Sequence, residues 1–256
     1  MKNIKQWPDF DDGMQQNLRY LNNKTMHNEW ALLENRYNII RNRAHQQDVI
    51  PKVLHQIWLG GSMPEKQKQQ CDQLRQTLPN DWEYKLWSND DVSSLLNFHN
   101  KELYCTTPNY GQKSDILRLE ILFQYGGVYC DTDIIGIKPF DELLDVDFFC
   151  GVAYDEWPSI LNSVMGSSPG NSVIKSMLNF SKKLEWYDGM SIIDTTGPYH
   201  TTRVIFDNIQ TNENIVVLPN SFFYPFSNDG THGLDSCIKY KRPETICCHL
   251  WQGSWM

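Results

Sequence analysis

The chain has 256 residues, of which 40% are hydrophobic and 21% charged, and its formal net charge is −8, so we expect one globular domain that does not wrap nucleic acid. It contains no run of about 18 apolar residues that could span a membrane, and its N-terminus lacks the apolar segment of a signal peptide. The seven cysteines show no metal-binding spacing, and reduced thiols in the cytoplasm are the simplest interpretation.

The N-terminal segment is predicted to form a helical cap. Leu18, Trp30 and Tyr37 belong to a set of apolar residues at helical spacing, in a stretch rich in Asn, Gln and Arg. The polar face of these helices is not strongly basic, so packing on the rest of the chain is favoured over binding to a membrane surface. We therefore divide the chain into a cap, residues 1–48, and a main domain, residues 49–256.

An apolar run that ends at Gly60-Gly61 predicts a buried first strand. Ligands of open α/β sheets bind at the C-terminal ends of such strands, and Ile57 and Trp58 lie at this end. Trp58 could stack on a flat ring, although a core aromatic is the simpler interpretation of this residue taken alone.

A helix is predicted over residues 64–78, and a second strand over residues 82–87, where apolar and polar residues alternate. The turn after this strand contains Asn89, for which two interpretations stay open. Its side chain could contact a nucleotide, or it could cap the helix that we predict over residues 92–103.

The central part of the chain reads as a helix, a Gly126-Gly127 turn and a strand over residues 128–134. Alternate residues of a strand share a face, so Tyr129, Asp131 and Asp133 are predicted to point the same way. Two carboxylates on one face of an apolar strand repel each other and are costly to bury unpaired. Mg²⁺ or Mn²⁺ would relieve both costs, and Asp133 is the predicted ligand, with Asp131 contacting a ribose or the metal through water.

Asp115 and Arg118 lie three residues apart on the preceding helix and therefore share a face. An isolated pair of this kind is most simply a surface ion pair worth about 0.3–0.5 kcal/mol. Because this pair precedes the glycine turn and the two aspartates, it can also converge on the same site.

The remaining chain alternates predicted strands and helices, which favours an α/β sandwich with a mixed central sheet. We expect strands over residues 148–153, 160–166, 216–218 and 222–224, and helices over residues 171–184 and 199–209. No Gly-rich phosphate loop occurs, so a diphosphate would have to be bound with the help of a metal.

The composite motif from Ser114-Asp115-x-x-Arg118 to Tyr129-x-Asp131-x-Asp133 resembles the sugar-binding region of the Asp-x-Asp glycosyltransferases of family 32. That family is related to the α-1,4-galactosyltransferases, the yeast initiating mannosyltransferases and the clostridial glucosylating toxins. The resemblance implies a GT-A type nucleotide-sugar-binding fold, a nucleotide-sugar donor, a divalent metal and retention of the anomeric configuration.

The resemblance also implies roles for single residues. Trp58 would open the nucleotide pocket, Asp115 would accept hydrogen bonds from hydroxyls of the donor sugar, and Arg118 would bind the sugar or the diphosphate. Asn162 and the loop of residues 195–199 are weaker candidates for contacts to the donor sugar and the acceptor.

A terminal His249-x-Trp251-x-x-Ser254-Trp255 matches a C-terminal element of the family. In it, His249 or Ser254 would complete the metal shell, and the indole N–H of Trp255 would reach a phosphate. Taken alone, a terminal histidine is more simply a solvent-exposed residue.

The sequence therefore predicts a metal-dependent retaining glycosyltransferase without an assigned catalytic base. The expected donor is UDP-linked galactose, glucose or N-acetylhexosamine, and the expected acceptor is a glycan or a lipid-linked glycan. The family favours surface-polysaccharide synthesis in the cytoplasm, with peripheral association at the inner face of the membrane. Two alternatives remain: a haloacid-dehalogenase-like phosphohydrolase with Asp131 as nucleophile and Asp133 as acid, and a non-catalytic sugar-binding module.

Overall fold

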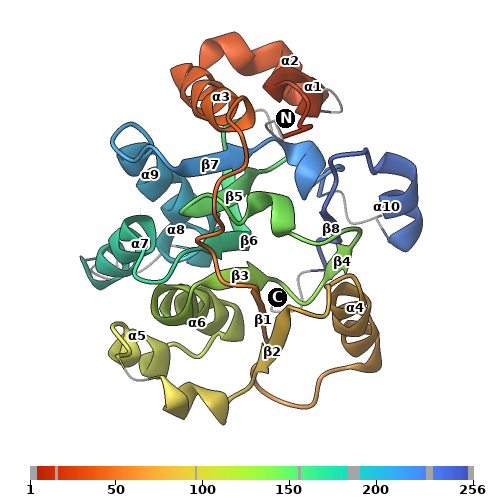
Figure 1. Ribbon diagram of the computed structural model, residues 1–256. Helices are drawn as coiled ribbons and strands as arrows, with labels where there is room; N and C mark the ends of the chain where they lie inside the picture. The colour runs from red at the N-terminus through yellow and green to blue at the C-terminus, as the bar shows by residue number, and fades with distance from the viewer. Residues whose placement is uncertain are drawn as a thin grey trace.

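The computed structural model describes residues 5–14, 17–95, 97–154, 157–183, 191–228 and 233–252. Six strands build the central mixed sheet: β1 (Val53–Ile57), β2 (Glu83–Trp87), β3 (Gly127–Cys130), β5 (Phe148–Val152), β6 (Ile160–Ser167) and β7 (Ile215–Leu218). Their order across the sheet is β2-β1-β3-β6-β5-β7 (Figure 1). β1 runs parallel to β2 and β3, whereas β6 is antiparallel to both of its neighbours. Two further strands, β4 (Ile134–Gly136) and β8 (Cys247–His249), form a small antiparallel sheet of their own.

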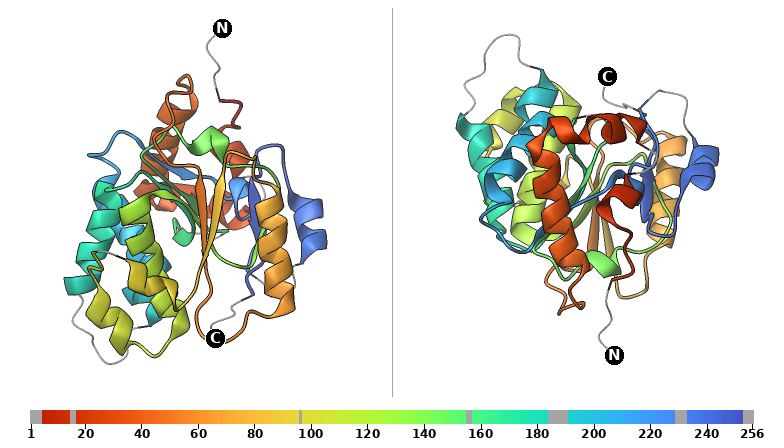
Figure 2. Two further views of the ribbon diagram at one scale, coloured as in Figure 1. Left: turned by 60° about the horizontal axis from the view of Figure 1, so that its bottom comes forward. Right: turned by 90° about the horizontal axis from the view of Figure 1, so that it is seen from above.

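Helices flank the sheet on both sides, as the predicted α/β sandwich requires (Figure 2). One side carries α5 (Lys101–Thr106), α6 (Tyr110–Tyr125), α7 (Ser172–Lys183), α8 (Ile192–Thr195) and α9 (Pro198–Asn208). The other side carries α4 (Glu65–Gln76) and α10 (Leu234–Tyr240). Short 3-10 helices connect these elements: η1 (Lys24–Met26), η2 (Asp91–Ser94), η3 (Asp141–Leu143) and η4 (Asn220–Phe222). The predicted fold class, a mixed α/β fold of GT-A type, is confirmed.

The N-terminal helices α1 (Phe10–Gly13), α2 (Leu18–Asn23) and α3 (Asn28–Arg41) lie over the β7 edge of the sheet (Figure 1). Trp7 stacks on Tyr37 with ring centroids 5.6 Å apart, and both rings contact Phe222 of the main domain. The aromatic core is therefore continuous between the N-terminal segment and the sheet. The domain boundary after residue 48 stays a prediction.

The connection from α6 to β3 shows why this part of the sequence folds as it does. The side chain of Asn109 accepts the backbone N–H of Gln112 and begins α6, and Gly126, with φ of 65°, ends it. Gly127 has φ of 93°, and a Cβ at this position would lie 2.6 Å from the carbonyl oxygen of Val53. Only glycine allows β3 to turn out of the helix directly beside β1.

The predicted continuous strand over residues 128–134 is wrong. β3 ends at Cys130, residues 131–133 form a turn closed by the Ile134 N–H on the Asp131 carbonyl, and the chain continues as β4 in the other sheet. The break arises because β3 pairs with β6 while β4 pairs with β8. Asp131 and Asp133 therefore converge across a tight turn, and the alternation of a strand does not place them.

Two further predicted elements differ. In place of a helix over residues 92–103, η2 and α5 are separated by an irregular segment, where buried Glu120 accepts the backbone and side-chain N–H groups of Asn100. In place of the predicted strand over residues 222–224, Phe222 ends η4 and the next two residues continue as a turn, in which the Tyr224 N–H bonds the carbonyl of Asn220 at 2.7 Å. Its aromatic side chains are buried, as a strand pattern would also require.

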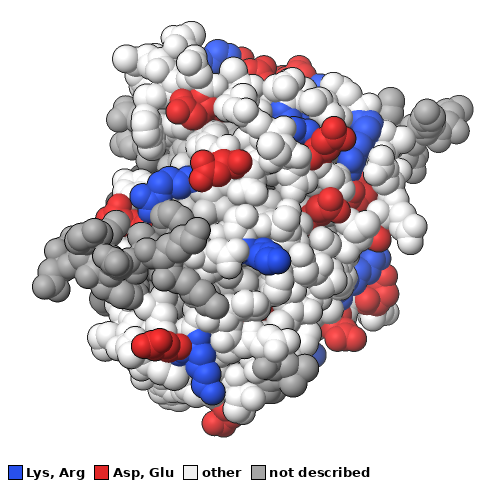
Figure 3. All heavy atoms as spheres, turned by 90° about the vertical axis from the view of Figure 1, so that its left-hand side faces the viewer, with Lys and Arg blue, Asp and Glu red and all other residues white. Residues whose placement is uncertain are grey.

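Among the helices that lie in the described residues, none is both long and apolar enough to cross a bilayer. On the face of the molecule shown in Figure 3, basic and acidic side chains are interspersed, and neither sign forms a continuous patch. This face lacks the extended basic surface that a nucleic-acid backbone requires.

Candidate active site

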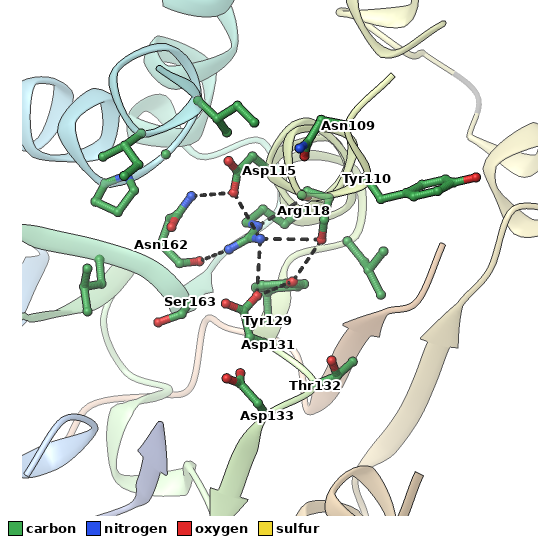
Figure 4. A pocket seen from close by; sticks show the side chains of 18 of the residues that line it. Asn109, Tyr110, Asp115, Arg118, Tyr129, Asp131, Thr132, Asp133, Asn162 and Ser163 are labelled. Atoms are coloured by element: carbon green, nitrogen blue, oxygen red, sulfur yellow. Dashed lines mark hydrogen bonds and ion pairs between the residues drawn. The ribbon is translucent and has the colours of Figure 1, made fainter. Parts of the chain in front are cut away.

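A pocket of about 550 Å³ opens where β1 and β3 end and β6 begins (Figure 4). This volume lies in the range of small-molecule and cofactor sites. Nine of the predicted site residues line it: Ile57, Trp58, Asp115, Arg118, Tyr129, Asp131, Asp133, Asn162 and His249. The pocket lies at the C-terminal ends of two parallel strands, which is where open α/β sheets bind ligands.

Asp131, Asp133 and His249 form a cluster at one end of the pocket. Their nearest ligand atoms all lie within 4.8 Å of one another. The Nε2 of His249 lies 3.1 Å from Oδ1 of Asp133 and 3.9 Å from Oδ2 of Asp131. The β4–β8 pairing brings them together, because Ile134 pairs directly with His249. His249 is buried, so a solvent-exposed terminal histidine is not what the structure shows.

The ionisation of this cluster reflects burial and mutual attraction. Burial alone would lower the pKa of His249, but the neighbouring Asp133 outweighs it and holds that pKa above the usual value. Burial alone would raise the pKa of Asp133, but His249 and the Gln252 N–H hold it below the usual value. Burial raises the pKa of Asp131 against the attraction of Arg118. The proximity of His249 and Asp133 therefore favours the charged form of each group.

These residues fit a divalent cation of the Mn²⁺ or Mg²⁺ class. Two carboxylates and an imidazole converge on one point, and the mixed oxygen and nitrogen donor set suits Mn²⁺ better than Mg²⁺. Oδ2 of Asp133 is fixed at 2.8 Å by the backbone N–H of Gln252, which leaves Oδ1 facing the cluster. Trp251 takes a left-handed φ of 56° in the turn that presents this N–H. The buried Nδ1 of His249 has no hydrogen-bond partner among the described residues, so Nε2 is the ring nitrogen that meets the carboxylates.

Arg118 lies at the centre of a second network and is 4% exposed. Its NH2 group lies 3.1 Å from Oδ1 of Asp115 and 3.2 Å from Oδ1 of Asp131, and its NH1 donates to the Asn162 carbonyl at 2.7 Å (Figure 4). Its guanidinium also stacks 4.4 Å from the centroid of the Tyr129 ring, whose hydroxyl donates to Oδ1 of Asp131 at 2.7 Å. The interpretation of Asp115 and Arg118 as a surface pair is therefore wrong.

Asp115 is buried and receives donors on both carboxylate oxygens. Asn162 donates to Oδ1 at 2.8 Å, and the hydroxyl of Thr196 donates to Oδ2 at 3.0 Å. Burial raises the pKa of Asp115 to about 6, although Arg118 and these hydrogen bonds oppose it, and nearby Asp131 adds to it. Burial therefore makes the ionised form of the Asp115 carboxylate less favourable than it is in water, as is common for groups in functional sites.

Trp58 is the residue on which a nucleoside base is predicted to stack. It lines the pocket half-buried, with its indole N–H fixed on the carbonyl of Gly61 at 3.0 Å. Asn89 does not line the pocket. Its amide bonds the backbone of Gly60 at 3.2 Å, so it supports the loop after β1 and neither caps η2 nor faces the cavity.

Two residues of the site, Gln252 and Thr196, have no predicted role of their own, and two predicted residues lie outside the described part of the chain. Ser254 and Trp255 lie outside the described residues, so their predicted roles stay predictions. Gln252 was not predicted, because it contributes only a backbone N–H, which leaves no signal in the sequence. Thr196 belongs to the loop that was a weak candidate, and its proximity to Asp115 comes from packing between distant helices.

Residues 64–149 match the family model described as the glycosyltransferase sugar-binding region containing the DXD motif. The chain is 28% identical over 210 residues to inositol phosphoceramide mannosyltransferase 1 of Schizosaccharomyces pombe. That alignment covers 75% of this chain and 66% of the relative, so the chain spans a little less than two thirds of its length.

Two of the solved structures with a similar fold are glycosyltransferases. The PaToxG glycosyltransferase superposes with a TM-score of 0.57 at 17% identity, covering 77% of this chain and 80% of that one. The UDP-bound glycosyltransferase domain from the YGT toxin gives 0.51 at 10% identity, covering 68% and 80%. The fold is therefore that of GT-A type glycosyltransferase domains, and the predicted resemblance to the Asp-x-Asp glycosyltransferases is confirmed.

Proposed function

We propose that this chain, a relative of the glycosyltransferases that carry the Asp-x-Asp sugar-binding region, transfers a hexose from a nucleotide sugar with retention of configuration. One observation carries the proposal: Asp131, Asp133 and His249 converge within 4.8 Å beside the buried Asp115 and Arg118 pair. Such a pocket joins a cation site for a diphosphate to a carboxylate that can accept hydrogen bonds from a sugar.

The charges of the pocket support a role for a metal. Among the lining residues that the structure describes, Arg118 is the one arginine or lysine, and Asp115 and Asp131 already occupy it. A diphosphate therefore has little cationic protein surface to bind, and the Asp131, Asp133 and His249 cluster would hold the cation that compensates its charge. When bound there, Mn²⁺ or Mg²⁺ supplies Lewis-acid stabilisation of the leaving phosphate.

The carboxylates also bear on how configuration would be retained. Asp115, Asp131 and Asp133 each bond protein donors, and we assign none of the three as a nucleophile on the anomeric carbon. This favours attack and departure on one face of the sugar, with the leaving phosphate accepting the proton of the acceptor hydroxyl. Asp115 and Asn162 would hold the sugar hydroxyls during this step.

The donor that we propose first is UDP-linked galactose, glucose or N-acetylhexosamine. Trp58 and Ile57 at the end of β1 would contact the base, and one structure of the same fold is named as UDP-bound. The relative from Schizosaccharomyces pombe is named a mannosyltransferase, which makes GDP-mannose the main competing donor.

For the acceptor we propose a glycan or a lipid-linked glycan, in surface-polysaccharide synthesis at the cytoplasmic face of a membrane. The apolar lining of the pocket includes Leu161, Ile193 and Pro198. An apolar wall suits an acceptor with an apolar portion, and the name of the yeast relative refers to a phosphoceramide.

A donor screen tests the proposal. The protein is incubated with Mn²⁺ and a panel of UDP- and GDP-sugars, and the released nucleotide is measured with and without EDTA. We expect metal-dependent hydrolysis of one donor group, abolished in Asp133→Asn, which removes one ligand charge while keeping the shape of the side chain. Asp141→Asn, on the exposed side of the fold, is the matched control and should leave turnover unchanged.

The outcomes also separate the alternatives. Hydrolysis of p-nitrophenyl phosphate without turnover of any nucleotide sugar would support the phosphohydrolase. Binding of a sugar without turnover of either substrate class would support a sugar-binding module. Full turnover in excess EDTA would contradict the metal.

A further inference from the structure

Thr196 lies in the short turn between α8 and α9 and is 2% exposed. Its hydroxyl donates to Oδ2 of Asp115 at 3.0 Å, while its carbonyl oxygen lies 3.4 Å from the amide nitrogen of Asn162. The same Asn162 nitrogen donates to Oδ1 of Asp115 at 2.8 Å. Asp115, Asn162 and Thr196 therefore form a closed triangle contributed by α6, β6 and the α8–α9 turn.

The triangle limits what Asp115 can still bind. A carboxylate oxygen accepts about two hydrogen bonds, and Oδ1 already has Asn162 and Arg118 as donors. Among the described residues Oδ2 has Thr196 as its one donor, so one acceptor position remains on that oxygen. The direction of this free position depends on where the Thr196 hydroxyl fixes the carboxylate.

The same contact fixes one wall of the pocket. Ile192 and Ile193 of α8 line the cavity, and α8 itself has only four residues. A capping box between Ser191 and Asp194 begins the helix. Its end is attached to α6 by Thr196 on Asp115 and by Gln112 Nε2 on the Thr195 hydroxyl at 3.3 Å. A helix this short has little stability of its own, so its position rests on these attachments.

We propose that Thr196 is a positioning residue, whose hydroxyl directs the free oxygen position of Asp115 toward the donor sugar and ties the α8 wall to the sugar-binding end of the pocket. This inference rests on the proposed transferase function. It gives Thr196 no contact with the diphosphate or the base, since its hydroxyl donates to Asp115, its carbonyl faces the amide of Asn162, and its backbone N–H donates to the Ile192 carbonyl of α8.

The experiment compares Thr196→Val, which keeps the shape and removes the hydroxyl, with Thr196→Ser, which keeps the hydroxyl. Thr201→Val is the matched control, because Thr201 is equally buried and its hydroxyl bonds only the Gly197 carbonyl of its own helix. We expect Thr196→Val to lower kcat/KM for the hydrolysed donor about tenfold and to leave the Kd of the free nucleoside diphosphate unchanged. Thr196→Ser should restore most of the activity, and Thr201→Val should match the wild type.

A wild-type kcat/KM in a folded Thr196→Val protein overturns the inference, as does an equal loss in the affinity for the nucleoside diphosphate. A loss that Thr196→Ser does not rescue also overturns it, because the hydroxyl would then not be the group that acts. A thermal melt of each variant identifies any that fails to fold.

Hydrogen exchange on the ligand-free protein separates this inference from the proposed function. Thr196→Val should speed exchange of the amides of residues 191–197, whereas Thr196→Ser and Thr201→Val should not. If the wild-type protein turns over no nucleotide sugar, the proposed function fails. The exchange result alone then decides whether the Thr196 hydroxyl holds α8 on α6. Unchanged exchange in Thr196→Val would then show that the Thr196 hydroxyl does not hold α8 in place.

Discussion

Asp115 is the residue at which stability and the proposed function oppose each other most directly. It is 8% exposed, and burial raises its pKa from 3.8 to about 6, even with Arg118 beside it. The folded protein therefore holds this carboxylate as an anion at neutral pH against a preference for the protonated form. Only a role for the charge explains why an uncharged residue does not occupy the position.

We predict that Asp115→Asn lowers activity and raises stability at pH 7. The folded-state pKa lies above the unfolded one, so the folded protein binds the proton more tightly, and the wild type loses stability as pH rises from about 4 to about 6. The variant does not titrate there, and the shift corresponds to at most about 3 kcal/mol in its favour at pH 7. Melting temperatures of both proteins measured from pH 4 to pH 7.5 check this: the two curves should meet near pH 4 and separate above it. A variant that is less stable at pH 7 would show that the charge stabilises the fold.

Arg118→Lys should cost at least tenfold in kcat/KM, or about 1.4 kcal/mol. The planar fork of Arg118 reaches Asp115, Asp131 and the Asn162 carbonyl together, and a single ammonium group cannot span these partners. The melting temperature should also fall, because two buried carboxylates would then repel each other with less compensation. Steady-state kinetics and a thermal melt give both readouts. Arg75→Lys, at an arginine that stacks on Tyr84 from α4 away from the pocket lining, is the control and should match the wild type.

For single residues, the sequence motif predicts the charged side chains of the pocket but not the groups that they bond. Asp115, Arg118, Asp131 and Asp133 stand at a spacing that chemistry and family resemblance both explain. Thr196 and Gln252 cannot be predicted in the same way, since one acts through packing between distant elements and the other through its backbone N–H.

The α6–β3 connection positions the whole pocket, and its glycines act through the backbone. Gly127→Ala should destabilise the protein by about 2 kcal/mol or more, because φ of 93° is strained for alanine and its Cβ would lie 2.6 Å from the Val53 carbonyl. Gly170→Ala is the matched control. Gly170 also has a positive φ, 69°, but no atom lies within 4 Å of the added Cβ. It should therefore show the backbone strain alone, about 1 kcal/mol. Denaturant unfolding of both variants measures the difference, and equal losses would show that the contact with β1 is not tight.

The segment from β3 to β4 shows why the prediction of elements failed there. Residues 128–134 carry the β-branched, aromatic and apolar residues of a strand, but only residues 128–130 belong to β3, and Ile134 begins β4. The turn at residues 131–133 arises because the halves join different sheets, one through β6 and the other through β8, which lies more than 110 positions later in the chain. The periodicity of a short segment does not predict which distant strand each of its parts pairs with. The helices α7 and α9, whose apolar faces are set within one segment, have observed bounds close to the predicted residues 171–184 and 199–209.

The whole molecule has a formal net charge of −8. Acidic residues also outnumber basic ones among the described residues that line the pocket. Asp115, Asp131 and Asp133 face one arginine and His249 across the same cavity. A protein with this balance repels a diphosphate unless a cation enters with it. The proposed metal would thus decide whether the nucleotide binds at all, in addition to any part in the chemical step.

We therefore predict that the nucleoside diphosphate chosen by the donor screen and Mn²⁺ bind cooperatively. Isothermal titration should show tight nucleoside diphosphate binding with Mn²⁺ and at least a tenfold weaker affinity in EDTA, because the phosphates would then meet the uncompensated Asp131 and Asp133. The nucleoside without phosphates should bind nearly equally well in both conditions, since it lacks the phosphate charges that the metal would compensate and its proposed base contact is Trp58, which is not in the acidic cluster. Reciprocity requires that the nucleotide tighten Mn²⁺ binding by the same factor, which a titration of the metal measures independently. Asp133→Asn should reduce this coupling factor toward one while leaving nucleoside binding intact. Equal affinity of the diphosphate with Mn²⁺ and in EDTA would mean that protein groups alone compensate its charge, and the acidic cluster would then need another explanation.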